Sequence, residues 1–210
     1  MSNKGSIIIG FILLVLVGIS TFLIFEIKTL ERPELIPQID IIQYRVEQAL
    51  TSLDLPEYKI KTYSPVIAYA CKKYNVSWKD AVAMYCVESW FDTYAVGDSL
   101  VGFTKERARG IQQNIPSTAK ESAANLGFPY IKGVTEHNPI FGMISGIYTL
   151  ANNYITWGNQ EHAIKAYIMG TQGLRKYYAG DKRMKKLYKL AMVDESWERF
   201  CKFYNSIEDK

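Results

Sequence analysis

Apolar positions recur at helical spacing along most of the chain, and no stretch keeps the strict alternation of a half-buried strand. Capping residues and prolines divide this pattern into segments. Predicted helices begin near Asp40, Ser64-Pro65, Ser77, Ser117, Asn138-Pro139, Asn159, Leu174, Lys182 and Asp194. Gly127 and Gly170 end two of them, because glycine readily adopts the left-handed conformation that terminates a helix. The pattern therefore predicts an all-α domain.

The helical pattern fails between Thr93 and Ile115. Gly97, Gly102 and Gly110 fall in this stretch, which predicts a long loop with at most a small β excursion. Long loops in compact domains are commonly functional, so this segment is a candidate wall of a site.

The segment from Ile7 to Phe25 differs from the rest, since its run of about 19 residues has no charge and is long enough to cross a bilayer as a helix. Lys4 precedes it, which favours an inside amino terminus. No Ala-x-Ala-like cleavage site follows it, so an uncleaved transmembrane signal anchor is preferred over a cleaved signal peptide. The remaining chain is then expected outside the cytoplasmic membrane.

The chain is accordingly predicted to have three parts. Residues 1–29 form the anchor, 30–62 a linker and stalk helix, and 63–210 the folded domain. Pro33 and Pro37 mark the linker. The helix that begins near Asp40 either packs on the domain or acts as a stalk.

Composition is that of an ordinary globular protein, with 48% hydrophobic and 22% charged residues. The net charge of +4 is too small to indicate a partner, and nothing indicates nucleic-acid binding. A basic run is interpreted as a solvated helix face. It comprises Lys182, Arg183, Lys185, Lys186 and Lys189.

The chain has three cysteines, Cys71, Cys86 and Cys201. One disulfide with a leftover thiol and three buried free thiols are both compatible with this number. Neither His137 nor His162 lies near a cysteine in sequence, so no zinc pattern is present.

Glu88 is the main candidate for chemistry. Helical spacing places Ala81, Met84, Tyr85 and Phe91 beside it, so its carboxylate lies on an apolar face. Desolvation of the charged form raises the pKa of such a carboxyl and makes it a plausible general acid near neutral pH. Taken alone, the same pattern also describes a half-solvated structural glutamate at a helix edge.

Three motifs in order carry a resemblance to a known family. They read Glu88-Ser89-Trp90-Phe91, Gly110-Ile111-Gln112-Gln113 and Ala166-Tyr167-Ile168-Met169-Gly170, with a looser match at Gly146-Ile147-Tyr148-Thr149-Leu150. From about Tyr63 to Gly180, the chain resembles the lytic transglycosylases, goose-lysozyme-like enzymes that cut the glycan strands of peptidoglycan. Gln112 stands where that family has Met, and Ile168 stands where it has Asn.

The resemblance implies a lysozyme-like α domain with Glu88 as the single catalytic carboxyl group. In this family the glutamic acid protonates the glycosidic oxygen of a MurNAc-GlcNAc β-1,4 bond. It then accepts the proton of the C6 hydroxyl, which closes on the anomeric carbon to give a 1,6-anhydro-MurNAc end. By the same resemblance Ser89, Gly110, Gln113 and Tyr167 bind substrate or shape the site. No metal or other cofactor is implied.

Two alternatives stay open. Asp92 or Asp98 could orient a water and make the protein a hydrolase of the goose-lysozyme type. The fold could also serve a non-catalytic wall-binding or scaffold protein. For an active enzyme the expected location is the bacterial cytoplasmic membrane, single-pass, with the catalytic domain outside or periplasmic. Its role there could be wall remodelling, opening the wall for a secretion or conjugation apparatus, or phage lysis.

Overall fold

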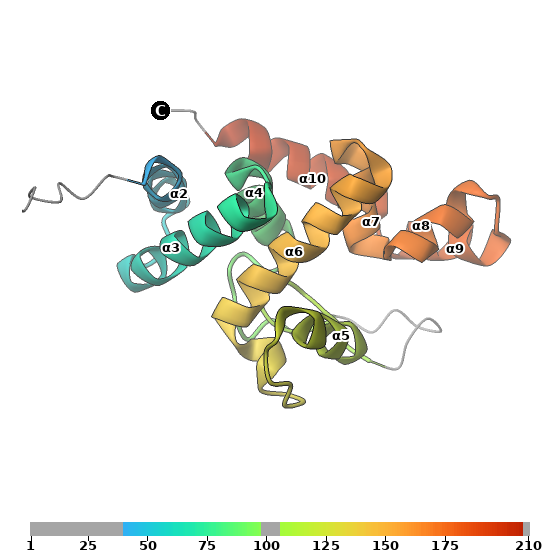
Figure 1. The fold of residues 1–210 in the computed structure, drawn as a ribbon. Coiled ribbons are helices and arrows are strands. Elements are labelled where there is room, and N and C mark those ends of the chain that lie inside the picture. The colour runs from blue at the N-terminus through green and yellow to red at the C-terminus, as the bar shows by residue number, and fades with distance from the viewer. Residues whose placement is uncertain (1–39, 98–105, 208–210) are drawn as a thin grey trace, which may run out of the picture. The chain divides into compact units, whose positions relative to one another are not determined.

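The computed structural model describes residues 40–97 and 106–207, which form an all-α arrangement (Figure 1). In chain order the helices are α2 (Ile41–Ser52), α3 (Glu57–Tyr74), α4 (Trp78–Glu88), α5 (Pro116–Leu126), the 3-10 turn η1 (Thr135–His137), α6 (Pro139–Trp157), α7 (Gln160–Met169), α8 (Thr171–Tyr178), α9 (Lys182–Leu190) and α10 (Val193–Ser206). Within the described ranges β pairing is limited to isolated bridges, Val96 with Arg109 and Arg109 with Asn114. The predicted all-α class is confirmed.

Several predicted helix boundaries are set by local chemistry, as expected. The Asp40 carboxylate accepts hydrogen bonds from the second and third backbone N–H groups after it, at 3.1 and 3.2 Å, and so caps α2. The Asn138 side chain caps α6 in the same way, at 3.0 and 3.1 Å. Gly127, with φ 72°, ends α5.

The predicted helix start at Ser64-Pro65 is wrong. Helix α3 begins seven residues earlier, at Glu57, and Pro65 lies inside it. A proline in a helix interior removes one backbone hydrogen bond. The helix nevertheless continues, because Tyr63 and Ile67 lie on either side of the proline and are both buried, at 5% and 0% exposure. Packing of this face outweighs the local preference.

Two predicted caps have other roles. The Ser77 hydroxyl accepts no capping hydrogen bond at the start of α4. Asp194 lies in the first turn of α10 rather than before it. Its carboxylate pairs with Lys165 at 2.7 Å and accepts a hydrogen bond from the Tyr188 hydroxyl at 2.6 Å. It therefore joins α10 to α7 and α9.

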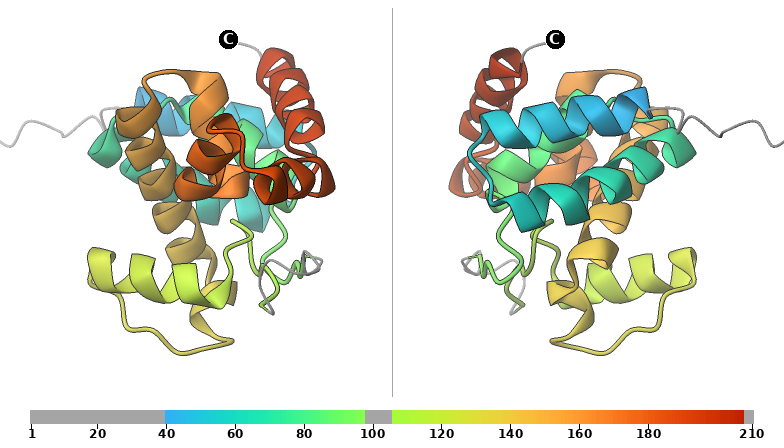
Figure 2. Two further views of the ribbon diagram at one scale, coloured as in Figure 1. Left: turned by 90° about the vertical axis from the view of Figure 1, so that its right-hand side faces the viewer. Right: turned by 90° about the vertical axis from the view of Figure 1, so that its left-hand side faces the viewer.

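Helix α6 lies at the centre of the core. Its Met143, Ile147 and Leu150 side chains are fully buried, and the helix packs against α3, α5 and α7. Helix α10 packs on α4 and α7, so α4 is held between α10 and the core (Figure 2). This packing positions the carboxyl-terminal end of α4, which carries Glu88.

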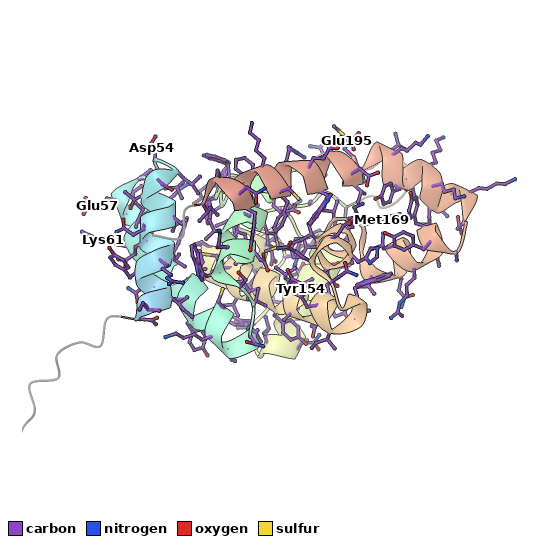
Figure 3. The ribbon with its side chains drawn as sticks, turned by 90° about the horizontal axis from the view of Figure 1, so that it is seen from above. Asp54, Glu57, Lys61, Tyr154, Met169 and Glu195 are labelled. Carbon is purple, nitrogen blue, oxygen red and sulfur yellow. The ribbon has the colours of Figure 1, made fainter. Side chains whose placement is uncertain are left out.

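A buried carboxylate ties three helices together. Asp80 on α4 is 5% exposed and accepts hydrogen bonds from the Tyr154 hydroxyl on α6, at 2.6 Å, and from the Gln160 amide on α7, at 2.7 Å. Tyr154 is labelled in Figure 3. Burial raises the pKa of Asp80 above its usual value, and the two hydrogen bonds act against that rise.

Helix α2 belongs to the same compact unit as the other helices, residues 40–210. Its Val46 and Leu50 side chains are fully buried, and α2 packs on α3 and α4. Of the two alternatives for this helix, packing on the domain is therefore the one observed, and residue 62 falls inside α3 rather than at a boundary.

The predicted anchor, Ile7–Phe25, lies outside the described residues. Within residues 40–97 and 106–207, no helix combines the length and the apolarity needed to span a membrane.

All three cysteines are free thiols. Cys71 and Cys86 are buried, and burial raises the pKa of each thiol to about 12. These two residues fill space in the core and are unreactive as nucleophiles near neutral pH.

Candidate active site

Glu88 is the last residue of α4, with its carboxyl group at the carboxyl-terminal end of the helix. Its predicted neighbours are buried, with Ala81 and Tyr85 at 0%, Phe91 at 1% and Met84 at 2% exposure. Desolvation raises the pKa of Glu88 to about 8. Glu88 itself is half-buried, and its apolar neighbours favour the protonated form of its carboxyl group near neutral pH.

A cation that the sequence gave no reason to select acts on Glu88. The Arg199 guanidinium of α10 lowers the pKa of Glu88 and so opposes part of the desolvation effect. Arg199 is exposed and donates a hydrogen bond to the Ser196 hydroxyl at 3.1 Å. In sequence it is one of several charges in the last helix, and only the packing of α10 on α4 brings it near Glu88.

The chain reverses sharply after Glu88. Trp90 and Phe91 both have left-handed backbone conformations, with φ 53° and 58°. This places the Phe91 ring in the core, against Tyr63 and Tyr85 at centroid distances of 6.3 and 5.6 Å. Trp90 stays 45% exposed and lies against Phe203 of α10 at 5.3 Å. The reversal therefore places one buried and one exposed aromatic ring directly after the end of α4.

Ser89 connects the end of α4 to the loop that contains the second motif. Its hydroxyl donates a hydrogen bond to the Ile111 carbonyl at 2.7 Å. Ser89 thus holds the segment Gly110–Gln113 beside Glu88, and its side-chain oxygen is engaged within the protein.

Gly110 is required by the close approach of two loops. Its φ is 74°, and a Cβ at this position would collide with the backbone carbonyl of Glu136. The Glu136 residue is fully buried, and its carboxylate accepts hydrogen bonds from the Tyr130 hydroxyl, at 2.8 Å, and from the Gly133 N–H, at 2.6 Å. Glu136 therefore holds its own loop, against which Gly110 rests.

The Gln113 side chain is directed at the loop backbone. Its amide nitrogen donates to the Gly110 carbonyl, at 2.8 Å, and to the Ala95 carbonyl, at 3.3 Å. Its amide oxygen lies so close to Gly97 that a Cβ there would be 2.6 Å away. Gln113 therefore satisfies backbone groups of the loop and shapes the site in this way.

Gln112 was noted in the sequence only because it stands where the family has Met, but it has structural contacts of its own. It is 1% exposed, and its amide oxygen accepts a hydrogen bond from the Ser145 hydroxyl of α6 at 2.6 Å. Its backbone carbonyl accepts the Tyr167 hydroxyl at 3.2 Å. Gln112 thereby joins the loop to both α6 and α7. Its amide nitrogen is buried without a hydrogen-bond partner among the described residues.

Tyr167 lies near Glu88. Its pKa is raised well above the usual value, first by desolvation and then by the charge of Glu88. Gly146 of α6 leaves room for the Tyr167 hydroxyl, since a Cβ there would lie 3.0 Å from it and 2.9 Å from the Tyr85 hydroxyl. The adjacent Ile168 packs on apolar clusters. The structure therefore brings Glu88, Tyr167 and the Gly110–Gln113 segment together.

Asp92 and Asp98 are the two candidates for a second carboxylate in the reaction. Asp92 is exposed, and its carboxylate accepts the backbone N–H of Tyr94 at 2.9 Å, which forms a local turn. Asp98 lies outside the described residues. Within the described ranges, no group of three or more His, Cys, Asp or Glu side chains is arranged to hold a metal ion.

A sequence model described as the transglycosylase SLT domain matches residues 65–190. This match covers more than half of the chain, and the chain belongs to that family. It contains the Glu88, Gly110–Gln113 and Tyr167 positions. A comparison with curated protein sequences finds no significant relative.

Two similar solved structures are soluble lytic transglycosylases. An inactive mutant of lytic transglycosylase Slt from Pseudomonas aeruginosa is 20% identical, with a TM-score of 0.49, over 73% of this chain and 25% of that one. The 70 kDa soluble lytic transglycosylase from Escherichia coli is 17% identical, with a TM-score of 0.49, over 80% of this chain and 29% of that one. This chain thus corresponds to less than a third of either protein.

Proposed function

We propose that this chain is a membrane-anchored peptidoglycan lytic transglycosylase with a lysozyme-like catalytic domain. The observation that carries the proposal is the environment of Glu88, where desolvation raises the pKa to about 8, in a chain of the transglycosylase SLT family. A carboxyl group that is protonated at neutral pH can give its proton to a glycosidic oxygen.

The reaction needs one carboxyl group in two roles. Glu88 first protonates the oxygen of the MurNAc-GlcNAc bond, and the bond to the anomeric carbon breaks. The Glu88 carboxylate then accepts the proton of the C6 hydroxyl of MurNAc as that oxygen bonds to the anomeric carbon. The product has a 1,6-anhydro end, no water is consumed, and Glu88 ends protonated. Asp92 supports its own turn instead, so nothing about it favours hydrolysis.

The other site residues act by shaping the surroundings of this carboxyl group. Ser89, Gly110 and Gln113 fix the loop beside the helix end, and the Tyr167 hydroxyl fixes the Gln112 carbonyl. In this proposal the glycan strand lies along that loop, where backbone groups and the exposed Trp90 ring can contact sugar.

Product analysis tests the reaction. A fragment with residues 30–210 should release muropeptides with 1,6-anhydro ends from purified peptidoglycan, detected by mass. Products heavier by one water would establish a hydrolase instead. Binding without any product, in a preparation that is folded by circular dichroism, would favour the scaffold alternative.

The rate should also report the pKa of Glu88. Because the reaction begins with the protonated acid, kcat/KM should fall as pH rises through about 8. Arg199 lowers this pKa by stabilising the carboxylate, so Arg199→Gln should move the falling limb to higher pH with the fold unchanged. A limb that stays in place would remove Arg199 from the electrostatics of the site. Lys202→Gln, a charge loss on the same helix, is the control.

We further propose that residues 1–29 are a single membrane anchor and that the domain lies outside the cytoplasm, where peptidoglycan is. The support is the uncharged segment Ile7–Phe25 together with the family's SLT domain. Protease added to spheroplasts should digest the domain while a cytoplasmic control protein survives. Protection of both would overturn this topology.

A further inference from the structure

Helices α8 and α9 form a hairpin that follows directly on α7, the helix that carries Tyr167 (Figure 1). Between Thr171 and Leu190 the chain has seven basic residues and one acidic residue, Asp181. All seven basic residues are exposed, namely Arg175, Lys176, Lys182, Arg183, Lys185, Lys186 and Lys189. Because the whole chain has a formal net charge of only +4, the rest of the chain is net negative and the net positive charge lies in this hairpin.

Four of these residues form a stripe along α9. Lys182, Lys185, Lys186 and Lys189 are spaced three, four and seven positions apart, so they share one face of the helix. We call this set the lysine stripe. The opposite face carries the buried residues Met184, Leu187 and Tyr188.

No carboxylate among the described residues forms an ion pair with the lysine stripe. The one acidic residue in the hairpin, Asp181, is used as the cap of α9, where it accepts backbone N–H groups at 2.8 and 3.0 Å. The stripe therefore presents four charges that nothing in the described part of the chain neutralises.

The hairpin is held firmly against the domain. Tyr177 of α8 and Tyr188 of α9 stack with a centroid distance of 3.9 Å and an interplanar angle of 10°. Lys165 of α7, 7% exposed, pairs with Asp194 at 2.7 Å, and the same carboxylate accepts the Tyr188 hydroxyl at 2.6 Å. These contacts fix α9 to α7 and α10, so the stripe has a defined place relative to the site.

The hairpin adjoins the site through a shared apolar cluster. Ala166 and Met169, on either side of Tyr167 in α7, pack with Leu174, Met184 and Leu187 of the hairpin. Figure 3 labels Met169 where α7 gives way to α8. The hairpin is therefore packed directly against the helix that carries Tyr167.

We propose that the lysine stripe docks the carboxylates of the acidic stem peptides carried by peptidoglycan, and so holds this polymer beside the catalytic site. The choice of polymer rests on the proposed function. The charges are complementary, and repeated carboxylates along one polymer can engage several lysines of a stripe at once. The stripe thus binds substrate peptide, whereas Glu88 acts on the glycan.

A lipid surface fits the stripe less well. A helix that binds at a membrane interface buries its apolar face in the lipid. In α9 that face is already occupied, since Met184, Leu187 and Tyr188 are between 4% and 7% exposed within the domain. The face of α9 that stays exposed to a partner is the charged lysine stripe.

Cosedimentation with insoluble peptidoglycan, stripped of other attached polymers, tests the docking. The full chain is used in a non-ionic detergent, with Glu88→Gln in every sample so that the glycan stays intact. The stripe variant combines Lys182→Gln, Lys185→Gln, Lys186→Gln and Lys189→Gln. A matched control combines Lys73→Gln, Lys120→Gln, Lys132→Gln and Lys202→Gln, which removes four exposed lysines from other elements.

The stripe variant should bind about tenfold more weakly than the unmodified stripe, since exposed charge pairs are individually modest but act together. The control variant should bind within about twofold of it. Amidation of the peptidoglycan carboxyl groups should have the same effect as the lysine substitutions. The protein with an unmodified stripe should bind amidated peptidoglycan as weakly as the stripe variant binds native peptidoglycan. Added salt should abolish the difference between the two proteins.

The proposal is overturned if the stripe variant binds like the control, or if amidated and native peptidoglycan bind equally. If the four stripe substitutions weakened binding to phosphatidylglycerol vesicles more than binding to peptidoglycan, lipid would be the occupant and the proposal would also be overturned. Helix content and melting temperature of each variant confirm that it is folded. Cleavage of peptide-free glycan by the chain with Glu88 intact is measured separately. Absence of cleavage with stripe-dependent binding would refute the proposed reaction, not the docking.

Discussion

Glu88→Gln is expected to abolish nearly all turnover while the domain stays folded. Glutamine keeps the size of the side chain and can still form hydrogen bonds, but it cannot give up and recover a proton. Loss of general acid–base catalysis alone typically lowers the rate about 10²–10⁴-fold. The measurement is release of anhydro-muropeptides from peptidoglycan at pH 7, beside the unmodified protein.

The same substitution should not lower stability. Because the pKa of Glu88 is about 8 in the folded domain and the ordinary value is 4.5, the folded state binds a proton more tightly than the unfolded state. The free energy of unfolding therefore declines between about pH 4.5 and 8 on account of this group. Glutamine does not titrate, so the Glu88→Gln melting temperature should equal or exceed that of the unmodified protein at pH 8.

Glu47→Gln on α2 serves as the matched control, since it removes a partly exposed carboxyl group from another helix. It should leave turnover within about twofold of the unmodified protein, as expected for a surface change outside the site. If Glu88→Gln instead kept turnover within about tenfold of the unmodified value, well above the loss expected for a catalytic acid, Glu88 would have no part in the mechanism.

Tyr167→Phe is expected to lower kcat by about 10- to 1,000-fold, the range for losing one positioned hydrogen bond in a site. The ring and its burial are retained, but the hydrogen bond from the hydroxyl to the Gln112 carbonyl is lost. That carbonyl belongs to the loop held beside Glu88 by Ser89. The loop should then be less well positioned when the glycosidic bond breaks.

The pH profile separates two possible roles of Tyr167. A hydrogen bond donated directly to the Glu88 carboxylate would lower the pKa of Glu88, and its loss would raise that pKa. In the structure the hydroxyl donates to Gln112, and the pKa of Glu88 is set by desolvation and Arg199. Tyr167→Phe should therefore lower the rate and leave the falling limb near pH 8, unlike Arg199→Gln.

A purely structural Tyr167 would give a different result. Its substitution would change the free energy of unfolding by about 1 kcal/mol and leave kcat and the pH profile unchanged. Thermal unfolding measured alongside the kinetics distinguishes these outcomes. Tyr44→Phe on α2, which changes an exposed tyrosine on a helix that carries none of the motifs, is the control.

The network around Gln112 shows why part of the site was beyond sequence reasoning. Gln112 contacts Ser145, 33 residues away, and Tyr167, 55 residues away. Neither partner stands at a helical spacing from it, so no periodic pattern connects them. By resemblance Gln113 binds substrate or shapes the site, and in the structure its amide is directed at the backbone of its own loop.

Sequence alone determined the all-α class, the caps at Asp40 and Asn138, and Glu88 as a carboxyl group on an apolar helix face. These follow from helical periodicity and from contacts within one turn, which the order of residues sets directly. Only the tertiary structure decided that α3 runs through Pro65, that Arg199 acts on Glu88, and that Ser89 and Tyr167 hold one loop. These depend on which helices pack together, and packing energy can override a local preference such as that of proline.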